Sequence, residues 1–186
     1  MNADEIRIPG RHNVRNYLAA FEAVRGYVSP EICRETAISF AGVPHRLEEV
    51  RTLHNVRYIN DSIASSPTRT IAGLRAMKTK PIILLGGYDK HLPFDNLGEE
   101  VCQRAKAAIV SGDTAERILE AIRAVSDSQD FPVFRTNNLS ESVSLASRLA
   151  QEGDTVLLSP ACASFDQFRN FEERGNLFKK LVMELE

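Results

Sequence analysis

The 186-residue sequence has no tryptophan and only three cysteines. Cys33, Cys102 and Cys162 are far apart and form no CxxC pair, so neither a disulfide framework nor a cysteine-based zinc site is expected. Each cysteine has apolar neighbours. We therefore expect all three to be small buried hydrophobic residues of a protein that resides in a reducing cytoplasm.

Long apolar runs and an excess of basic charge are also missing. No apolar stretch approaches the roughly 18 residues of a transmembrane helix, and residues 1–10 lack the basic-then-apolar pattern of a signal peptide. The 23 Lys and Arg residues against 25 Asp and Glu residues leave a net charge of −2 at pH 7. We therefore expect no membrane segment and no broad surface for nucleic acid or anionic lipid.

Several motifs of catalysis and nucleotide binding are absent as well. The sequence contains neither the P-loop pattern GxxxxGK[ST] nor the dinucleotide-binding pattern GxGxxG. The hydrolase pattern GxSxG is missing, and none of the four histidines has the context of a catalytic triad. A hydrolase is therefore not expected.

The composition that remains is that of a globular protein, with 43% hydrophobic and 26% charged residues. The first forty residues have a helical hydrophobic period. We predict one helix over His12–Arg25, which Gly26 ends. A second helix is predicted from Pro30 to about Phe40, with Ser29 as its N-cap. This helical hairpin is too small to be a domain of its own.

From Arg46 onwards, short apolar runs alternate with helical segments. The predicted strands are Leu47–Leu53, Val56–Asn60, Pro81–Leu85, Ala107–Val110, Pro132–Arg135 and Thr155–Leu158. The predicted helices are Pro67–Met77, Ala115–Val125, Ser140–Gln151 and most of Phe168–Glu186. This alternation predicts an α/β fold with a doubly wound, largely parallel, Rossmann-like sheet and helices on both faces, preceded by a short helical segment. We place the boundary between residues 1–42 and 43–186.

Ligands of such sheets bind beyond the carboxyl ends of the strands, and the second predicted strand ends in a polar segment. Asp61 follows this strand and could hold a ribose hydroxyl. Alternatively, Asp61, Ser62 and Ser66 could serve to cap the next helix.

Two further strand ends carry candidate binding loops. In Gly86–Lys90, the two glycines would let the backbone approach a ligand closely, and Lys90 would offer a cation for a carboxylate or phosphate. The alternative is a surface turn with a solvated lysine. Ser159–Asp166 consists largely of small residues before a helix, and its amides could hold a carboxylate.

Other candidates lie near the domain boundary and in the first helix. The guanidinium of Arg46 suits a phosphate, and its alternative role is a salt bridge to Glu48 or Glu49. Asn13 and Asn16 share one helical face and could be caps or could present their amides to a nucleobase.

Five motifs follow one another along the chain: GRHNVRNYLAA from Gly10, GVPHRLE from Gly42, YINDS from Tyr58, LLGGYDK from Leu84 and LLSPACASFDQFRNFEERGNLF from Leu157. The residues and the order of these motifs resemble those of the Mur ligase family over residues 7–186. The stretch Ser159–Phe178 is most similar to the members that add D-glutamate.

The resemblance implies an ATP-dependent amide ligase of peptidoglycan synthesis. In this family the carboxylate of UDP-N-acetylmuramoyl-L-alanine becomes an acyl phosphate, which the amine of D-glutamate attacks. Residues 1–42 would be the helical end of the central ATPase domain, and residues 43–186 the C-terminal amino-acid-binding domain. The P-loop, the Mg²⁺ ligands and the modified lysine of the family lie in preceding domains, against which this chain would pack. We therefore expect no catalytic residue, no metal site and no activity in the chain alone.

The resemblance also assigns site residues by position. The nucleotide site would comprise Asn13 and Asn16 at the adenine, Arg46 at the phosphates, Asp61 at the ribose and His45 along the same cleft. The D-glutamate site would comprise Ser65, Lys90, Ser164, Phe165 and Phe171. Cations and hydroxyls suit a dianionic amino acid, because both can bind its carboxylates.

One position departs from the family, which often has lysine, in NDSKATN, where this sequence has Ile63. Either Lys90 carries more of the dicarboxylate's charge here, or another basic side chain such as Arg69 compensates. The DNPR motif of the diaminopimelate- and lysine-adding relatives is absent, which favours D-glutamate. Two alternatives remain: a stand-alone module that binds a nucleotide or an acidic ligand, and another Mur-type or folylpolyglutamate ligase domain, which the SPACASFDQF motif disfavours.

Overall fold

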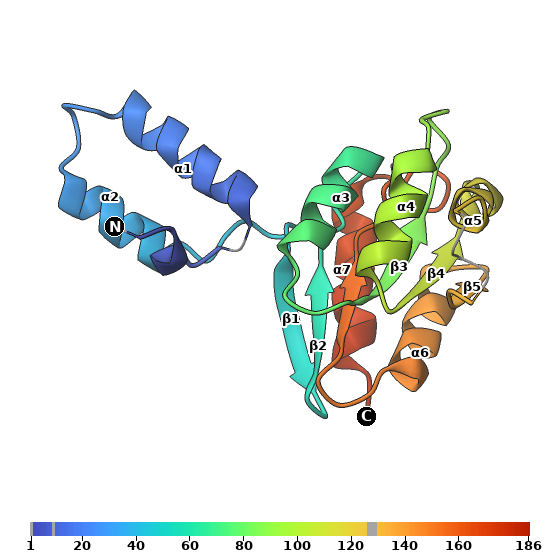
Figure 1. The fold of residues 1–186 in the computed structure, drawn as a ribbon. Helices are drawn as coiled ribbons and strands as arrows, with labels where there is room; N and C mark the ends of the chain where they lie inside the picture. The colour runs from blue at the N-terminus through green and yellow to red at the C-terminus, as the bar shows by residue number, and fades with distance from the viewer. Residues whose placement is uncertain (1, 9, 126–129) are drawn as a thin grey trace. The chain divides into compact units, whose positions relative to one another are not determined.

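Figure 1 shows the computed structural model of the chain, which describes residues 2–8, 10–125 and 130–186. The chain divides into two compact units, Met1–Val43 and Pro44–Glu186.

The first unit contains helices. The 3-10 helix η1 (Ala3–Glu5) precedes α1 (Arg11–Ala23) and α2 (Pro30–Ser39), so both helices predicted here are confirmed. Ser29 caps α2, because its Oγ accepts a 3.4 Å hydrogen bond from the backbone amide of Ile32. The Arg7 amide donates to the Ala37 carbonyl (3.1 Å) and thereby ties the N-terminal segment to α2.

The second unit is a six-stranded sheet covered by helices. Its strands are β1 (Glu48–Leu53), β2 (Val56–Asn60), β3 (Ile82–Gly86), β4 (Ala107–Ser111), β5 (Val133–Arg135) and β6 (Thr155–Leu158). Its helices are α3 (Pro67–Ala76), α4 (Asp95–Arg104), α5 (Ala115–Arg123), α6 (Leu139–Leu149) and α7 (Phe171–Met183). The strand order is β1-β2-β6-β3-β4-β5; β1 is antiparallel to β2, and the other pairs are parallel. The predicted doubly wound, largely parallel α/β sheet is confirmed.

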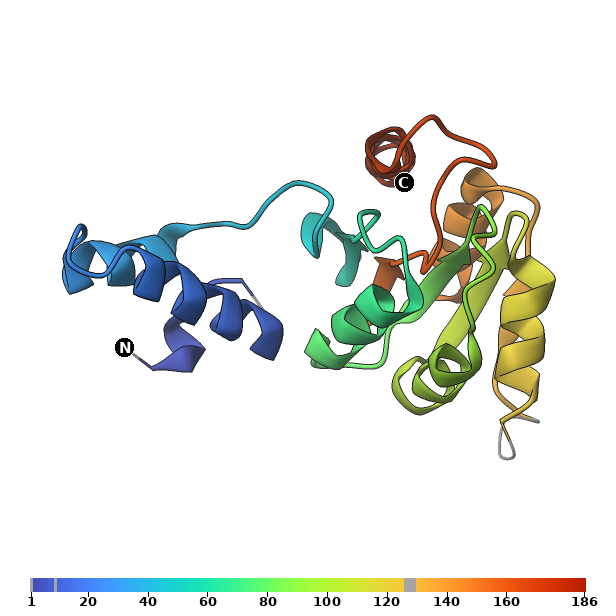
Figure 2. The same ribbon diagram turned by 90° about the horizontal axis from the view of Figure 1, so that it is seen from above.

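The strands bury side chains in two separate cores. On β3, Ile83 and Leu85 pack with α3, α4 and α5, whereas Ile82 and Leu84 pack with α6 and α7. Figure 2 shows α3 and α4 on one side of the sheet and α7 on the other. Because β3 is buried on both faces, its sequence is an uninterrupted apolar run instead of an alternating one.

The turn between β1 and β2 confirms the predicted hairpin. His54 and Asn55 form it, with φ angles of 48° and 60°. Positive φ at both central residues is the conformation whose twist matches that of the flanking strands.

Helix α4 is not marked by the sequence pattern. Leu97 and Val101 are fully buried one turn apart, but the segment is otherwise polar and contains Gly98. A Cβ at Gly98 would overlap the Ala121 carbonyl of α5. Glycine therefore lowers the local helix propensity but lets α4 and α5 approach closely, and their packing stabilises the helix.

Candidate functional site

Three loops meet at the carboxyl ends of the parallel strands: residues 61–66 after β2, 87–92 after β3 and 159–170 after β6. They adjoin because β6 lies between β2 and β3 in the sheet. The Ala161 amide donates to the Ala64 carbonyl (3.0 Å). The Tyr88 amide donates to the Ala163 carbonyl (2.9 Å). Backbone hydrogen bonds thus join the candidate loops identified in the sequence at one edge of the sheet.

Asp61, at the end of β2, is a buried carboxylate. Its Oδ2 accepts a 2.7 Å hydrogen bond from Ser159 Oγ, and its Oδ1 accepts a 3.3 Å bond from the Leu47 amide. Burial raises the pKa of Asp61 to about 7, although these bonds and the nearby positive charges of Arg46 and Arg69 act in the opposite direction. The group can therefore change its charge near neutral pH.

The alternative that Asp61, Ser62 and Ser66 cap α3 holds only for the position of Ser66. Ser66 occupies the N-cap position, but its side chain makes no capping bond to the described backbone; its hydroxyl lies 3.3 Å from Thr68 Oγ1. Ser62 Oγ instead donates to the Phe171 carbonyl at the start of α7 (2.8 Å). The polar residues of this loop thus connect distant segments.

His45 is buried behind this loop in a left-handed backbone conformation, with φ of 64°. Asn60 accepts a 3.1 Å bond from the Ser62 amide through Oδ1 and turns Nδ2 toward His45 Nδ1, 2.9 Å away. Burial and the charge of Lys179 lower the pKa of His45. Because the amide Nδ2 can only donate, this contact requires His45 Nδ1 to be the acceptor. Asn60 is not among the site residues predicted from the sequence, because its contact with His45 exists only in the folded chain.

Arg46, next to His45, is exposed. Its alternative role as a partner of Glu48 or Glu49 is wrong within the described residues. Glu48 pairs with Lys179 (3.1 Å), and Glu49 pairs with Arg57 (3.2 Å). The Arg46 guanidinium thus remains open to an anion.

Lys90 and Phe165 come from different loops and lie together. The Lys90 ammonium is 5.8 Å from the centroid of the Phe165 ring. Tyr88 contacts the same ring edge-on, with 6.1 Å between centroids. Asp89 does not pair with Lys90, because it binds the Arg117 guanidinium (2.6 Å) and the His91 amide (2.7 Å). No carboxylate in the described part of the chain forms an ion pair with Lys90.

The remaining D-glutamate candidates lie around these loops. Ser164 is buried in the turn after β6, where its carbonyl accepts from the amides of Gln167 (3.2 Å) and Phe168 (2.8 Å). Ser65 is half-buried on the β2 loop. Phe171 is the first residue of α7, and its ring meets His45 edge-on, with 5.9 Å between centroids.

Asn13 and Asn16 belong to the first unit, whereas the other candidates lie in the second. They lie on one face of α1, as predicted, and Asn16 Nδ2 donates to Asn13 Oδ1 (3.4 Å). The N-cap of α1 is Gly10, so neither asparagine occupies the N-cap position of this helix.

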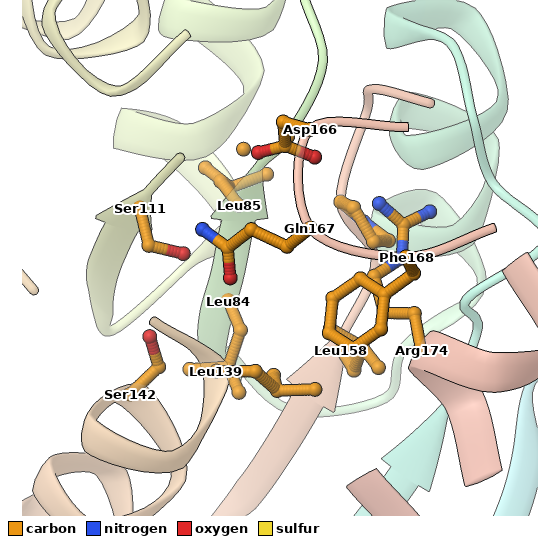
Figure 3. Close-up of a pocket in the computed structure, with 13 residues that line it drawn as sticks. Leu84, Leu85, Ser111, Leu139, Ser142, Leu158, Asp166, Gln167, Phe168 and Arg174 are labelled. Atoms are coloured by element: carbon orange, nitrogen blue, oxygen red, sulfur yellow. The ribbon is translucent and has the colours of Figure 1, made fainter. Parts of the chain in front are cut away.

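A pocket opens between the carboxyl ends of β3 and β4, the start of α6 and the loop after β6 (Figure 3). None of the residues predicted for the two binding sites lines it. Its polar lining includes Asp166, whose pKa is raised by burial and by the charge of Asp113. It also includes Arg174, which is 4% exposed and whose pKa burial lowers to about 10.

The described residues contain no group of three or more His, Cys, Asp or Glu side chains that could hold a metal ion. In the same part of the chain, no helix is both long and apolar enough to cross a membrane.

Comparison with known sequences reveals similar proteins. The family model described as "Mur ligase, glutamate ligase domain" matches residues 45–162. A UDP-N-acetylmuramoylalanine–D-glutamate ligase of Clostridium acetobutylicum is 50% identical over 186 residues, which cover 99% of this chain and 40% of that protein. The enzyme of the same name from Acetivibrio thermocellus is 48% identical over 188 residues, with the same two coverages. The chain thus spans about 40% of the length of the curated relatives it matches.

Solved structures with a similar fold come from several ligases. Folylpolyglutamate synthase of Mycobacterium tuberculosis, complexed with ADP and AMPPCP, matches with a TM-score of 0.66 and 16% identity over 92% of this chain and 41% of that chain. A pseudomurein peptide ligase type C from Methanothermus fervidus matches with a TM-score of 0.66 and 16% identity over 95% of this chain and 36% of that chain. At these identities the similarity shows the fold alone.

Proposed function

This chain belongs to the Mur ligase family, whose glutamate ligase domain it carries, and we propose that it is the amino-acid-binding part of a ligase that adds D-glutamate to UDP-N-acetylmuramoyl-L-alanine. The proposal is supported by D-glutamate ligases that are 48% and 50% identical along 99% of the chain. Residues 1–42 would then be the helical end of a central ATPase domain, and residues 43–186 the domain that delivers D-glutamate.

The observation that carries the proposal is the environment of Lys90. Its ammonium lies over an exposed aromatic ring, that of Phe165, and its nearest carboxylate in sequence is bound to Arg117. A cation oriented in this way is available to a ligand carboxylate. Lys90 would bind one carboxylate of D-glutamate.

Hydroxyls and aromatic rings would complete the D-glutamate site. Ser164 lies on the β6 loop, which adjoins the β3 loop, and Ser65 lies on the β2 loop on the other side of the β6 loop. Their hydroxyls would donate to the second carboxylate. Phe165 and Phe171 would enclose the carbon chain of the amino acid. Ile63 supplies no charge, so Lys90 and Arg69 would provide the positive potential.

The residues proposed to contact the nucleotide belong to both units of the chain. Arg46 is exposed and unpaired with its neighbouring glutamates, which suits it to the phosphates of ATP. Asp61 accepts two hydrogen bonds, and a carboxylate has about four acceptor positions, so the ribose hydroxyls could occupy the others. Asn13 and Asn16 would contact the adenine, with His45 in the wall of the cleft. The fold of M. tuberculosis folylpolyglutamate synthase, complexed with ADP and AMPPCP, supports ATP as the nucleotide.

In the proposed reaction, ATP phosphorylates the carboxylate of UDP-N-acetylmuramoyl-L-alanine and releases ADP. The D-glutamate amine then attacks the acyl phosphate, forms the amide and expels phosphate. The residues of this chain bind and orient the amine and exclude water from the reacting carbonyl. Mg²⁺ would neutralise the phosphate charge, and its ligands are assigned to the preceding domains.

Kinetics of the full-length ligase that contains this chain test the proposal. With UDP-N-acetylmuramoyl-L-alanine and ATP, we expect phosphate release that depends on D-glutamate. Lys90→Ala should raise the KM for D-glutamate about tenfold or more, the loss expected for a charge-assisted hydrogen bond, and leave the KM for ATP unchanged. Lys80→Ala, which changes an exposed lysine at the opposite end of β3, is the matched control.

Two outcomes would contradict the proposal. If the wild-type enzyme transfers glutamate to a folate and ignores D-glutamate, it is a folylpolyglutamate-type ligase. If the 186-residue chain alone binds ATP or D-glutamate in calorimetry as tightly as the full-length protein, it is a stand-alone binding module. An unchanged KM in Lys90→Ala would remove Lys90 from the site.

A further inference from the structure

A buried arginine of α7 joins two of the loops at the proposed D-glutamate site. In the loop after β2, Arg174 Nε donates to Ser62 Oγ (3.0 Å), and Nη2 donates to the Ser62 carbonyl (2.9 Å). In the loop after β6, Nη2 donates to the Cys162 carbonyl (3.1 Å), and Nη1 donates to the Ala163 carbonyl (3.2 Å). One guanidinium therefore fixes the distance between loops that are about a hundred residues apart in the sequence.

The same side chain is linked to the other segments of the site. Ser62 Oγ, which accepts from Arg174, donates onward to the Phe171 carbonyl (2.8 Å). A Cβ at Gly87, in the loop that leads to Lys90, would lie 3.1 Å from Arg174 Nη1. Ser164 and Phe165 follow the bound Ala163 directly. The guanidinium thus contacts or adjoins every segment that carries a proposed D-glutamate contact.

The oxygen partners of Arg174 are uncharged, and no carboxylate of the described residues lies within ion-pair distance of it. Asp166 faces the same pocket (Figure 3) but forms no ion pair with it. A buried cation without a counter-ion is costly to stability. Arginine nevertheless suits this position, because its planar fork can direct several hydrogen bonds at once and stays charged.

Arg51 provides an internal comparison at the other end of the same helix. Its Nη1 donates to the carbonyls of Val182 (3.2 Å), Met183 (3.1 Å) and Leu185 (3.0 Å). These bonds satisfy the last carbonyls of α7, which is a structural role. Both arginines bind backbone carbonyls, but only the partners of Arg174, among the described residues, belong to the loops of the site.

We propose that Arg174 is a positioning residue for D-glutamate: its guanidinium holds the β2 and β6 loops and the start of α7 at the separation that lets their hydroxyls and rings contact the amino acid together. It does not touch the substrate. This inference rests on the proposed function, since it assigns a role within the same site.

The test compares Arg174→Lys with Arg51→Lys in the full-length ligase. Lysine keeps the charge of Arg174 but cannot make the forked set of bonds. We expect Arg174→Lys to raise the KM for D-glutamate about tenfold, the effect of losing two or more hydrogen bonds, with the KM for ATP within about twofold of wild type. Arg51→Lys should lower the melting temperature and leave both KM values unchanged.

Ser62→Ala provides a second test that does not remove the buried charge. It deletes the hydroxyl between Arg174 and Phe171 and should raise the KM for D-glutamate about threefold, the effect of a smaller hydrogen-bond loss. If Arg174→Lys does not fold, this variant decides: a raised KM for D-glutamate supports the proposal, and a wild-type value overturns it.

Two results with folded Arg174→Lys would overturn the inference: a wild-type KM for D-glutamate, or an equal rise in the KM values for D-glutamate and ATP. If the wild-type enzyme uses D-glutamate, either result leaves the proposed function intact. A wild-type enzyme that does not use D-glutamate removes the proposed function itself.

Discussion

Ser159 Oγ and Asp61 Oδ2 are joined by a 2.7 Å hydrogen bond that connects the ends of β6 and β2. The hydroxyl also lies 3.1 Å from Thr70 Oγ1 of α3. A Cβ at Gly73, one turn further along α3, would lie 3.0 Å from Asp61 Oδ2. The carboxylate is therefore largely buried, with Asp61 only 4% exposed, and this burial raises its pKa to about 7.

Asp61 should make the stability of the chain dependent on pH. Its folded-state pKa of about 7 lies above the ordinary aspartate value of 3.8, so the folded state binds the proton more tightly. The stabilising contribution is complete below about pH 4 and is lost as the pH rises through 7. Asp61→Asn should reduce this loss, which is at most about 4 kcal/mol for a pKa that rises from 3.8 to about 7.

Urea unfolding of the chain at pH 5 and pH 8 measures this effect. Asp130→Asn, a change in an exposed turn, is the control and should keep the wild-type difference between the two pH values. An Asp61→Asn variant with that same difference would contradict the prediction.

Gly175 and His45 should be energetically coupled. A Cβ at Gly175 would overlap the His45 ring, so Gly175→Ala should destabilise the chain by about 1–3 kcal/mol, as overpacking does. In a His45→Ala background the ring is gone, and Gly175→Ala should then be close to neutral. A double-mutant cycle of unfolding free energies measures the coupling; strictly additive effects would show that the two residues do not compete for space.

Phe165 should orient Lys90. Phe165 is 59% exposed, so removing its ring should affect stability little. Phe165→Ala does, however, remove the cation–π contact of the Lys90 ammonium. We expect the KM for D-glutamate of the full-length ligase to rise about three- to tenfold, in the range of a cation–π contact. Met183→Ala, which truncates a side chain that is 60% exposed at the far end of α7, should have no effect. If the Phe165→Ala variant keeps the wild-type KM for D-glutamate, the ring does not orient Lys90 for binding.

Arg69 should compensate for the uncharged Ile63. Its Nη1 donates to the Ile63 carbonyl (3.3 Å), which holds the guanidinium at the β2 loop. Arg69→Ala should raise the KM for D-glutamate about fivefold or more, as the loss of a charged hydrogen bond does, and Ile63→Lys in that background should restore part of it. Arg75→Ala, on the same helix but paired with Glu100, is the control. If Ile63→Lys restores nothing, position 63 is not near the substrate.

Local sequence signals were sufficient for much of the fold. The apolar run of β3, the His54-Asn55 turn and the Ser29-Pro30 helix start each depend on residues within one short segment. The order of strands and helices was sufficient to predict that the loops carrying Asp61 and Lys90 lie at the same edge of the sheet. Helix α4 was not predictable in this way, because its stability comes from close packing against α5 across Gly98.

The sequence by itself determined the alternating α/β pattern and the three polar strand ends, because hydrophobic period and turn chemistry are local properties. Only the tertiary structure decided the partners within the site. It turned Asn60 toward His45, paired Glu48 with Lys179 in place of Arg46, and buried Arg174 between loops up to 112 residues away in the sequence. The contacts of Arg174 depend on β6 lying beside β2 in the sheet, an arrangement that no short segment of the sequence specifies.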